Sequence, residues 1–154
     1  MRSGLAIGGV ALIVAGAAIG FGWWWPKTAQ ADEQVTGKVT AVRIANDSGS
    51  VRVRAGDGSV TSVHEHFSYS WRRPSDRSYS VDGGTLLLSD CGHWCSVDYV
   101  VVVPRGTSVS GHATSGDITV DGATNVDVQA DSGSVTVRDV RGTVKTQASS
   151  GDVT

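Results

Sequence analysis

The chain has 154 residues, of which 13 are Lys or Arg and 15 are Asp or Glu, giving a formal net charge of −2. This length allows one modest domain, or one domain with an anchor. The balanced charge argues against a nucleic-acid-binding protein, which needs a concentrated basic surface. Two cysteines are too few for a disulfide-dense scaffold or a four-cysteine zinc site.

The N-terminal end carries an uncharged, mostly apolar run over residues 4–25, close to the roughly 20 residues that cross a bilayer as a helix. Arg2 precedes it, which favours a cytoplasmic N-terminus, and the run ends in three tryptophans at 23–25, a residue type enriched at membrane interfaces. The sequence therefore predicts a single-pass membrane anchor over residues 1–27, followed by a linker over 28–34.

A cleaved signal peptide is the alternative, because residues 29–31 read Ala-Gln-Ala, followed by two acidic residues. Cleavage after Ala31 would give a secreted protein. The apolar run is longer than the usual 7–15 residues of a signal peptide, which favours the anchor. Both interpretations place the rest of the chain outside the cytoplasm.

Residues 35–154 have the composition and the alternation of an all-β domain. Val, Thr, Ser, Gly and Asp dominate, and apolar side chains recur at every second position. Val97, Tyr99, Val101 and Val103 form one such series. A second series runs through Val63, Phe67, Tyr69 and Trp71, with Glu65 as a charged exception.

A short unit of the type Ser-Gly-Asp/Ser-Val/Ile-Thr-Val repeats in the second half. Copies begin at Ser115, Ser132 and Ser150, about 17 residues apart, and an earlier copy begins at Ser48 outside the regular array. A fixed period is typical of solenoids, whose units stack to bury a shared apolar face. The prediction is a parallel β-solenoid (β-helix) of short Ser-Gly-Asp-Val coils.

That solenoid would stack equivalent residues of successive coils in parallel register: Ile118, Val135 and Val153 in one column, and Val126 with Val144 in another. An antiparallel sandwich of hairpins is the alternative, since its strands also alternate. The chain stops inside the third copy without a cap. This predicts either a fragment truncated at its C-terminus or an open end paired in an assembly.

The order of motifs resembles the DUF4097 family of bacterial β-strand repeat adhesins, particularly its actinobacterial members. The matching features are the apolar N-terminal segment, Cys91 and Cys95 followed by Val-Asp-Tyr, the Val-Pro-Arg-Gly-Thr segment from Val103, and the serial Ser-Gly units. The resemblance covers roughly residues 35–154. It implies a right-handed-type β-helix at the cell surface without known enzymatic activity. Members of the family usually contain more of the repeats than this chain does.

The stretch Cys91-Gly-His-Trp-Cys95 favours a structural disulfide, since an exported location permits one and the short loop can bring the sulfurs together. A thiolate–imidazole metal site with His93 and a redox-active pair are the weaker alternatives.

A candidate ligand-contact loop comprises His64, His66, Arg72, Arg73 and Trp94. The two histidines should share one face of a strand, and the arginines, with Arg77, could grip a carboxylate or phosphate of a cell-wall polymer. Solvated polar surfaces are the commoner role for such residues. Asp117, Ser134 and Asp152 occupy equivalent positions in the repeats, and stacking would align them in a ladder that could bind Ca²⁺. Solvated turn residues are again the favoured interpretation.

Catalytic motifs are lacking: the sequence contains no G-x-S-x-G, no H-E-x-x-H and no phosphate-binding loop. We expect no enzyme, no cofactor and no metal. The favoured function is a non-enzymatic cell-envelope adhesin or surface scaffold, partnered by the membrane through its anchor and by a cell-wall polymer or surface protein. The alternative is a sensory or regulatory ectodomain that binds an envelope ligand or ion.

Overall fold

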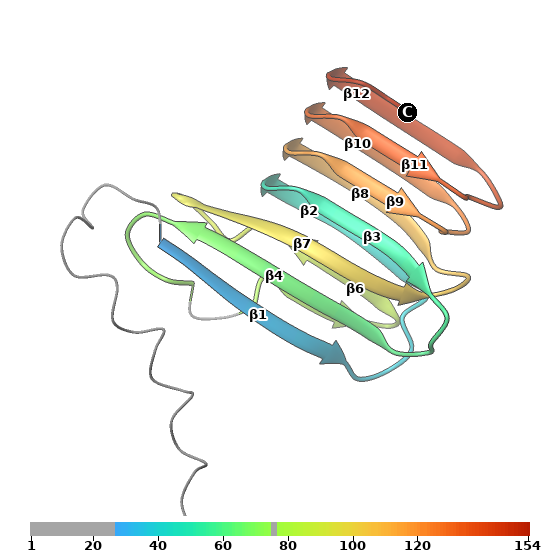
Figure 1. Cartoon of the computed structure of the whole chain (residues 1–154), viewed down its shortest axis with the longest axis horizontal. Coiled ribbons are helices and arrows are strands. Elements are labelled where there is room, and N and C mark those ends of the chain that lie inside the picture. The colour runs from blue at the N-terminus through green and yellow to red at the C-terminus, as the bar shows by residue number, and fades with distance from the viewer. Residues whose placement is uncertain (1–26, 75–76) are drawn as a thin grey trace, which may run out of the picture.

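The computed structural model describes residues 27–74 and 77–154, which fold into two six-stranded β-sheets (Figure 1). The first sheet contains, in spatial order, β1 (Lys27–Val35), β4 (Thr61–Tyr69), β7 (Cys95–Pro104), β3 (Val51–Gly56), β9 (Ile118–Asp121) and β11 (Val135–Arg138). The second contains β12 (Val144–Ser150), β10 (Val126–Ser132), β8 (Ser108–Ser115), β2 (Ala41–Ser48), β6 (Thr85–Ser89) and β5 (Tyr79–Asp82).

A single apolar core lies between the two sheets, as the alternating sequence predicts. Along β7 every second residue is buried, and Val97, Tyr99, Val101 and Val103 all point inward. Leu86 and Leu88 of β6 face them from the second sheet and belong to the same core. β-branched side chains suit this pleated, half-buried surface, so the all-β prediction for the domain is confirmed.

The repeated units pair in the predicted parallel register. Val135 of β11 pairs with Ile118 of β9 and bridges to Val153, and Val126 of β10 pairs with Val144 of β12. The early copy is not an outlier in space, because Val51 of β3 pairs in parallel with Ile118. β3 thus lies between β9 and β7, although β7 follows it by about forty residues in the chain (Figure 1).

The predicted parallel β-solenoid is nevertheless wrong as a description of the domain, because both sheets are mixed. β1 pairs antiparallel with β4, β4 pairs antiparallel with β7, and β5 pairs antiparallel with β6. The alternation that suggested stacked coils reports which side chains are buried. It carries no information on strand direction, and the N-terminal half of the domain lacks the repeat that revealed direction in the C-terminal half.

The predicted transmembrane helix falls on residues outside those that the structure describes. Within 27–74 and 77–154 no helix is long and apolar enough to cross a membrane. Lys27, the last residue assigned to the anchor, instead begins β1, and the expected linker over 28–34 lies in that strand, paired with β4.

The Ser-Gly pairs form the corners where the chain passes from the second sheet to the first. Gly116, Gly133 and Gly151 have φ values of 128°, 141° and 141°, a region that favours glycine. A Cβ atom on Gly133 would lie closer than 3.0 Å to the carbonyl oxygen of Gly116, and one on Gly151 would meet that of Gly133 in the same way. Glycine is therefore required because each repeat rests directly on the backbone of the one before.

Candidate functional site

One edge of the first sheet extends beyond the second sheet. Three pairs of strands follow each other directly in the chain: β2 and β3, β8 and β9, and β10 and β11. In each pair the first strand lies in the second sheet and the next strand lies in the first sheet, so these pairs fix which strands of the two sheets lie across from each other. In this alignment β5 lies across from β4, and β1 has no strand of the second sheet opposite it. The inner side of β1 is therefore available to line a cleft.

We call this space the β1 cleft; its volume is about 560 Å³. It is lined by Gln30, Ala31, Asp32, Glu33, Glu65, Phe67, Arg73, Pro74 and Arg77. These residues come from β1, from β4 and from the connection between β4 and β5. The cleft combines three acidic residues from neighbouring strands, Asp32, Glu33 and Glu65, with two arginines from the connection.

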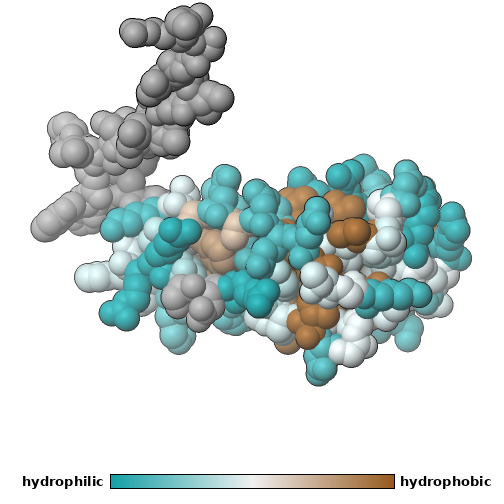
Figure 2. All heavy atoms as spheres, turned by 90° about the horizontal axis from the view of Figure 1, so that it is seen from below, coloured by the Kyte–Doolittle hydropathy of each residue, from teal (hydrophilic) through white to brown (hydrophobic). Residues whose placement is uncertain are grey.

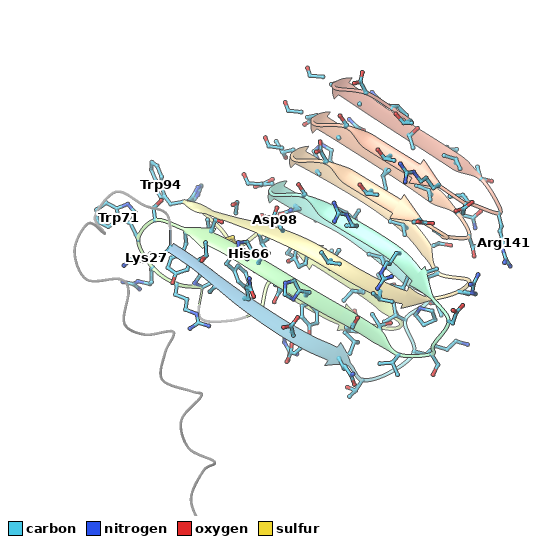
Figure 3. The ribbon with its side chains drawn as sticks, in the orientation of Figure 1. Lys27, His66, Trp71, Trp94, Asp98 and Arg141 are labelled. Carbon is cyan, nitrogen blue, oxygen red and sulfur yellow. A yellow bond between two sulfur atoms is a disulfide. The ribbon has the colours of Figure 1, made fainter. Side chains whose placement is uncertain are left out.

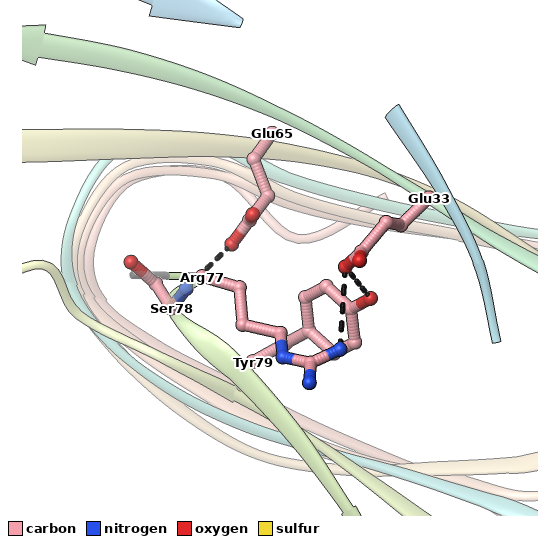
Figure 4. Close-up of polar contacts among 5 residues, drawn as sticks. All are labelled: Glu33, Glu65, Arg77, Ser78 and Tyr79. Atoms are coloured by element: carbon pink, nitrogen blue, oxygen red, sulfur yellow. Dashed lines mark hydrogen bonds and ion pairs between the residues drawn. The ribbon is translucent and has the colours of Figure 1, made fainter. Parts of the chain in front are cut away.

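Glu65 is the deepest charged group in the cleft, with 1% of its surface exposed. Its position between Val63 and Phe67 on the inward side of β4 forces this burial. Its carboxylate accepts a 2.9 Å hydrogen bond from the backbone amide of Ser78 (Figure 4). Burial raises the pKa of Glu65 because it penalises the charged form; the Ser78 amide opposes this effect, and nearby Glu33 adds to it.

Glu33 joins β1 to the start of β5. Its carboxylate accepts a hydrogen bond from the Tyr79 hydroxyl and lies 3.4 Å from Nη1 of Arg77 (Figure 4). The Arg77 guanidinium also lies over the Tyr79 ring, 5.6 Å from its centroid. Burial, followed by the hydrogen bond with Glu33, raises the pKa of Tyr79.

These contacts hold residues 77–79 against β1 and β4. Glu65 accepts the hydrogen bond of the Ser78 amide, and Glu33 contacts the side chains of Arg77 and Tyr79. Both carboxylates are thus occupied by groups of the chain itself. A pair of carboxylates with different environments is typical of acid–base chemistry, but here each already has structural hydrogen-bond partners.

A second cluster lies at the end of the domain where β1 begins and β4 ends. Trp71 and Trp94 are 84% and 78% exposed there, and Figure 3 shows both beside Lys27. The backbone amide of Ser70 donates a 3.2 Å hydrogen bond to the Trp94 carbonyl, which joins the two loops that carry the indoles. Exposed large aromatic side chains in a cluster mark interaction surfaces more often than isolated ones do.

The predicted disulfide between Cys91 and Cys95 is confirmed, and it closes the loop that presents Trp94. Its two Cα atoms are 5.7 Å apart, within the usual range for such bonds. Both sulfurs are therefore committed to the disulfide. Trp94 has a φ of 62°, a conformation that is rare for a bulky residue and is held by the closed loop.

His64 and His66 share the outer face of β4, as their spacing predicted, and point away from buried Glu65. His64 contacts the carboxylate of Asp32 on β1, and Nδ1 of His66 lies 3.3 Å from Nε2 of Gln30. Among residues 27–74 and 77–154, no three His, Cys, Asp or Glu side chains are placed to hold a metal ion.

The Asp/Ser ladder has a structural use. The Asp117 carboxylate accepts a 2.8 Å hydrogen bond from the amide of Ser134 in the next repeat. Asp98 of β7 does the same for the amide of Ser50 at 2.7 Å. These aspartates therefore connect adjacent strands at their corners.

The predicted ligand-contact residues do not form one site. His64 and His66 lie on the outer face, and Arg73 lines the β1 cleft. Trp94 lies at the end with Trp71, and Arg72 follows Trp71 in the chain. Sequence reasoning missed the cluster of Glu33 and Tyr79 with Glu65. One signal was available: Glu65 occupies an inward position in an apolar series, where a carboxylate needs partners.

Comparison with known proteins finds a similar fold in a solved structure. No protein-family model matches the chain, and the search of curated proteins found no match. A crystal structure of a putative cell adhesion protein from Clostridium sporogenes is similar, with a TM-score of 0.54 and 10% identical residues, over 83% of this chain and 97% of that one. At this identity the similarity shows the fold alone, and membership of the DUF4097 family stays a prediction.

Proposed function

We propose that the protein is a non-enzymatic cell-envelope protein that presents its β domain outside the membrane for adhesion or scaffolding. The observation that carries this proposal is the similarity of fold, over most of both chains, to a protein described as a putative cell adhesion protein. The finer assignment, to actinobacterial DUF4097 adhesins, rests on the motif order in the sequence.

Two features of the chain support an extracytoplasmic location. The apolar run over residues 4–25 is a sequence typical of an anchor, and the disulfide between Cys91 and Cys95 is of a kind that persists in oxidising compartments. The folded surface is mostly polar on the face that Figure 2 shows, with apolar residues emerging in separate patches. Such a surface suits a protein that contacts water and other polymers.

The non-enzymatic part of the proposal rests on how the polar groups are used. The cleft carboxylates of Glu33 and Glu65 are bound to Arg77, Tyr79 and Ser78. That of Asp32 contacts His64, and the two histidines face the other way. A general acid and base would need to be free to face a substrate.

The test uses the full chain produced in a bacterial host. We expect it to stay in the membrane pellet after carbonate extraction, and its β domain to be digested by protease added outside spheroplasts. Cells that produce the full chain should bind purified cell-wall sacculi or neighbouring cells. This binding should be weaker in cells that produce the Gly133→Ala variant, whose β domain is damaged. Full protection from external protease, or a mature chain that begins at Asp32, would contradict the anchored arrangement.

The β1 cleft favours one second candidate, a sensory ectodomain that binds an envelope ligand. Its volume of about 560 Å³ lies within the range of small-molecule sites. Calorimetric titration of the full chain in detergent with soluble cell-wall fragments would test this. We expect binding to be lost in Arg73→Gln and retained in Arg141→Gln if the cleft is a receptor site.

A further inference from the structure

We propose that the end of the β domain carrying Lys27, Trp71, Arg72 and Trp94, here called the tryptophan tip, inserts into the headgroup region of the membrane that anchors the chain. The occupant is a bilayer containing anionic phospholipid. The inference rests on the proposed anchored location and adds to it, because the folded domain itself becomes a membrane-contacting surface with a defined orientation.

Chain connectivity supplies the first argument. If residues 4–25 cross the bilayer, Trp25 lies at its outer interface. Lys27 follows two residues later, and two residues of chain span at most about 7 Å. The first residue of β1 is therefore held at the level of the headgroups, whatever conformation the intervening residue adopts.

Strand pairing then brings the aromatic loops to the same place. Lys27 pairs with Tyr69 on β4, and Tyr69 pairs with Cys95 on β7. Neighbouring strands are about 4.8 Å apart, so these three residues lie within about 10 Å of one another. Trp71 follows Tyr69 by two residues and Trp94 precedes Cys95 directly, which places both indoles at this edge (Figure 3).

The chemistry of the tip fits a membrane interface. Indole rings prefer this region because they combine an apolar body with a polar N–H group. Lys27 and Arg72 supply positive charge at the tip, although all 15 acidic residues of the chain belong to the exported part. Basic side chains near the surface bind anionic lipid phosphates.

The structure also constrains Trp94 to face outward. The disulfide closes its loop, the Ser70 amide holds its carbonyl, and its backbone stays at a φ of 62°. Such a conformation has a cost and tends to persist where the residue has a use. A tryptophan that only filled space would lie in the core, whereas this one is 78% exposed.

The experiment places one fluorescent label on the full-length protein in vesicles of phosphatidylcholine and phosphatidylglycerol. Trp71→Cys is labelled with an environment-sensitive dye under conditions that keep the native disulfide, and quencher groups are attached to the lipids just below the headgroups. Arg141→Cys is the matched control, because Arg141 is exposed at the other end of the domain from the tip (Figure 3). Arg72→Cys serves as a second label site at the tip.

We expect the labels at positions 71 and 72 to shift to shorter emission wavelengths and to lose most of their emission to the lipid quencher, with no change at position 141. The shift at 71 should weaken in vesicles without phosphatidylglycerol, and in R72Q. If the vesicles carry the protein but neither tip label is quenched, the tip proposal is wrong and the anchor stands. Equal quenching at 71 and 141 would also overturn it. Failure of the protein to float with vesicles would overturn both the anchor and the tip.

Discussion

The glycine of each Ser-Gly pair is determined by a contact with the preceding repeat. Gly133 passes directly over the carbonyl oxygen of Gly116, and a Cβ atom would overlap that oxygen. Its φ of 141° adds a conformational reason for glycine. The two causes can be separated, because Gly37 has a φ of 110° and a Cβ atom added there would meet no other atom within 4 Å.

We expect Gly133→Ala to lower the free energy of unfolding by more than Gly37→Ala does, with the difference about 1–3 kcal/mol. Both variants strain φ, but only the first also forces an atom into a packed backbone. Urea denaturation of the two variants and the parent chain measures the difference. Equal losses would show that the repeats are not in contact through this glycine.

Glu65 makes stability depend on pH. Its pKa is raised by burial, so the folded chain binds a proton more readily than the unfolded chain between the unfolded and folded pKa values. The contribution of Glu65 to the free energy of unfolding is therefore fully present below the unfolded pKa, near 4.5, and is lost as the pH rises through the folded pKa.

Glu65→Gln should remove that loss, because the amide keeps an oxygen for the Ser78 N–H and has no charge to bury. We expect the variant to gain stability relative to the parent chain as pH rises above 4.5, and to match it more closely below. Denaturation midpoints across this range, with exposed Asp127→Asn as control, measure the effect. A difference between variant and parent that does not change with pH would contradict the burial argument.

The C-terminal half of the domain is built from short strands that pair in parallel. Thr119 of β9 and Thr136 of β11 are register partners on the outward side of the first sheet. Parallel neighbours are about 4.8 Å apart, which is within reach of a short crosslink. Thr119 and Arg138 lie on the same side but two residues out of register.

We therefore expect Thr119→Cys with Thr136→Cys to crosslink with a short thiol-reactive reagent several times faster than Thr119→Cys with Arg138→Cys. Both pairs keep the native disulfide and differ only in register. Peptide mapping by mass spectrometry gives the yields. A faster reaction in the second pair would contradict the register in which Thr119 faces Thr136.

At the scale of the whole molecule, the disulfide reports the compartment in which the domain folds. We expect Cys91 and Cys95 of the full chain to resist alkylation in cells until a reductant is added, because export places them in an oxidising compartment. A chain without residues 1–26 should keep both thiols reactive in the cytoplasm. Alkylation followed by mass spectrometry distinguishes the two.

Labelling of both cysteines in the full chain without reductant would contradict export. The effect of the bond on global stability should be modest, about 2 kcal/mol, because it closes a very short loop. Its larger effect is local, on the loop that holds Trp94 outward.

The amino-acid sequence determined the features that depend on neighbouring residues or on repetition. Alternation along residues 97–103 identified a half-buried strand, and the recurring Ser-Gly units identified the parallel register of Ile118 with Val135. The short spacing of Cys91 and Cys95, together with an exported location, predicted their bond. Each of these follows from local geometry or from units similar enough to stack in one way.

Only the tertiary structure decided which distant segments become neighbours. β3 pairs with β7 and β9 from opposite sides, and β1 and β4 run antiparallel where stacked parallel coils were predicted. Burial patterns state which side of a strand is apolar but not its partner or its direction. For the same reason the sequence gives no sign that Lys27 and Trp94, which are far apart in the chain, lie at one end of the domain, where strand pairing places them.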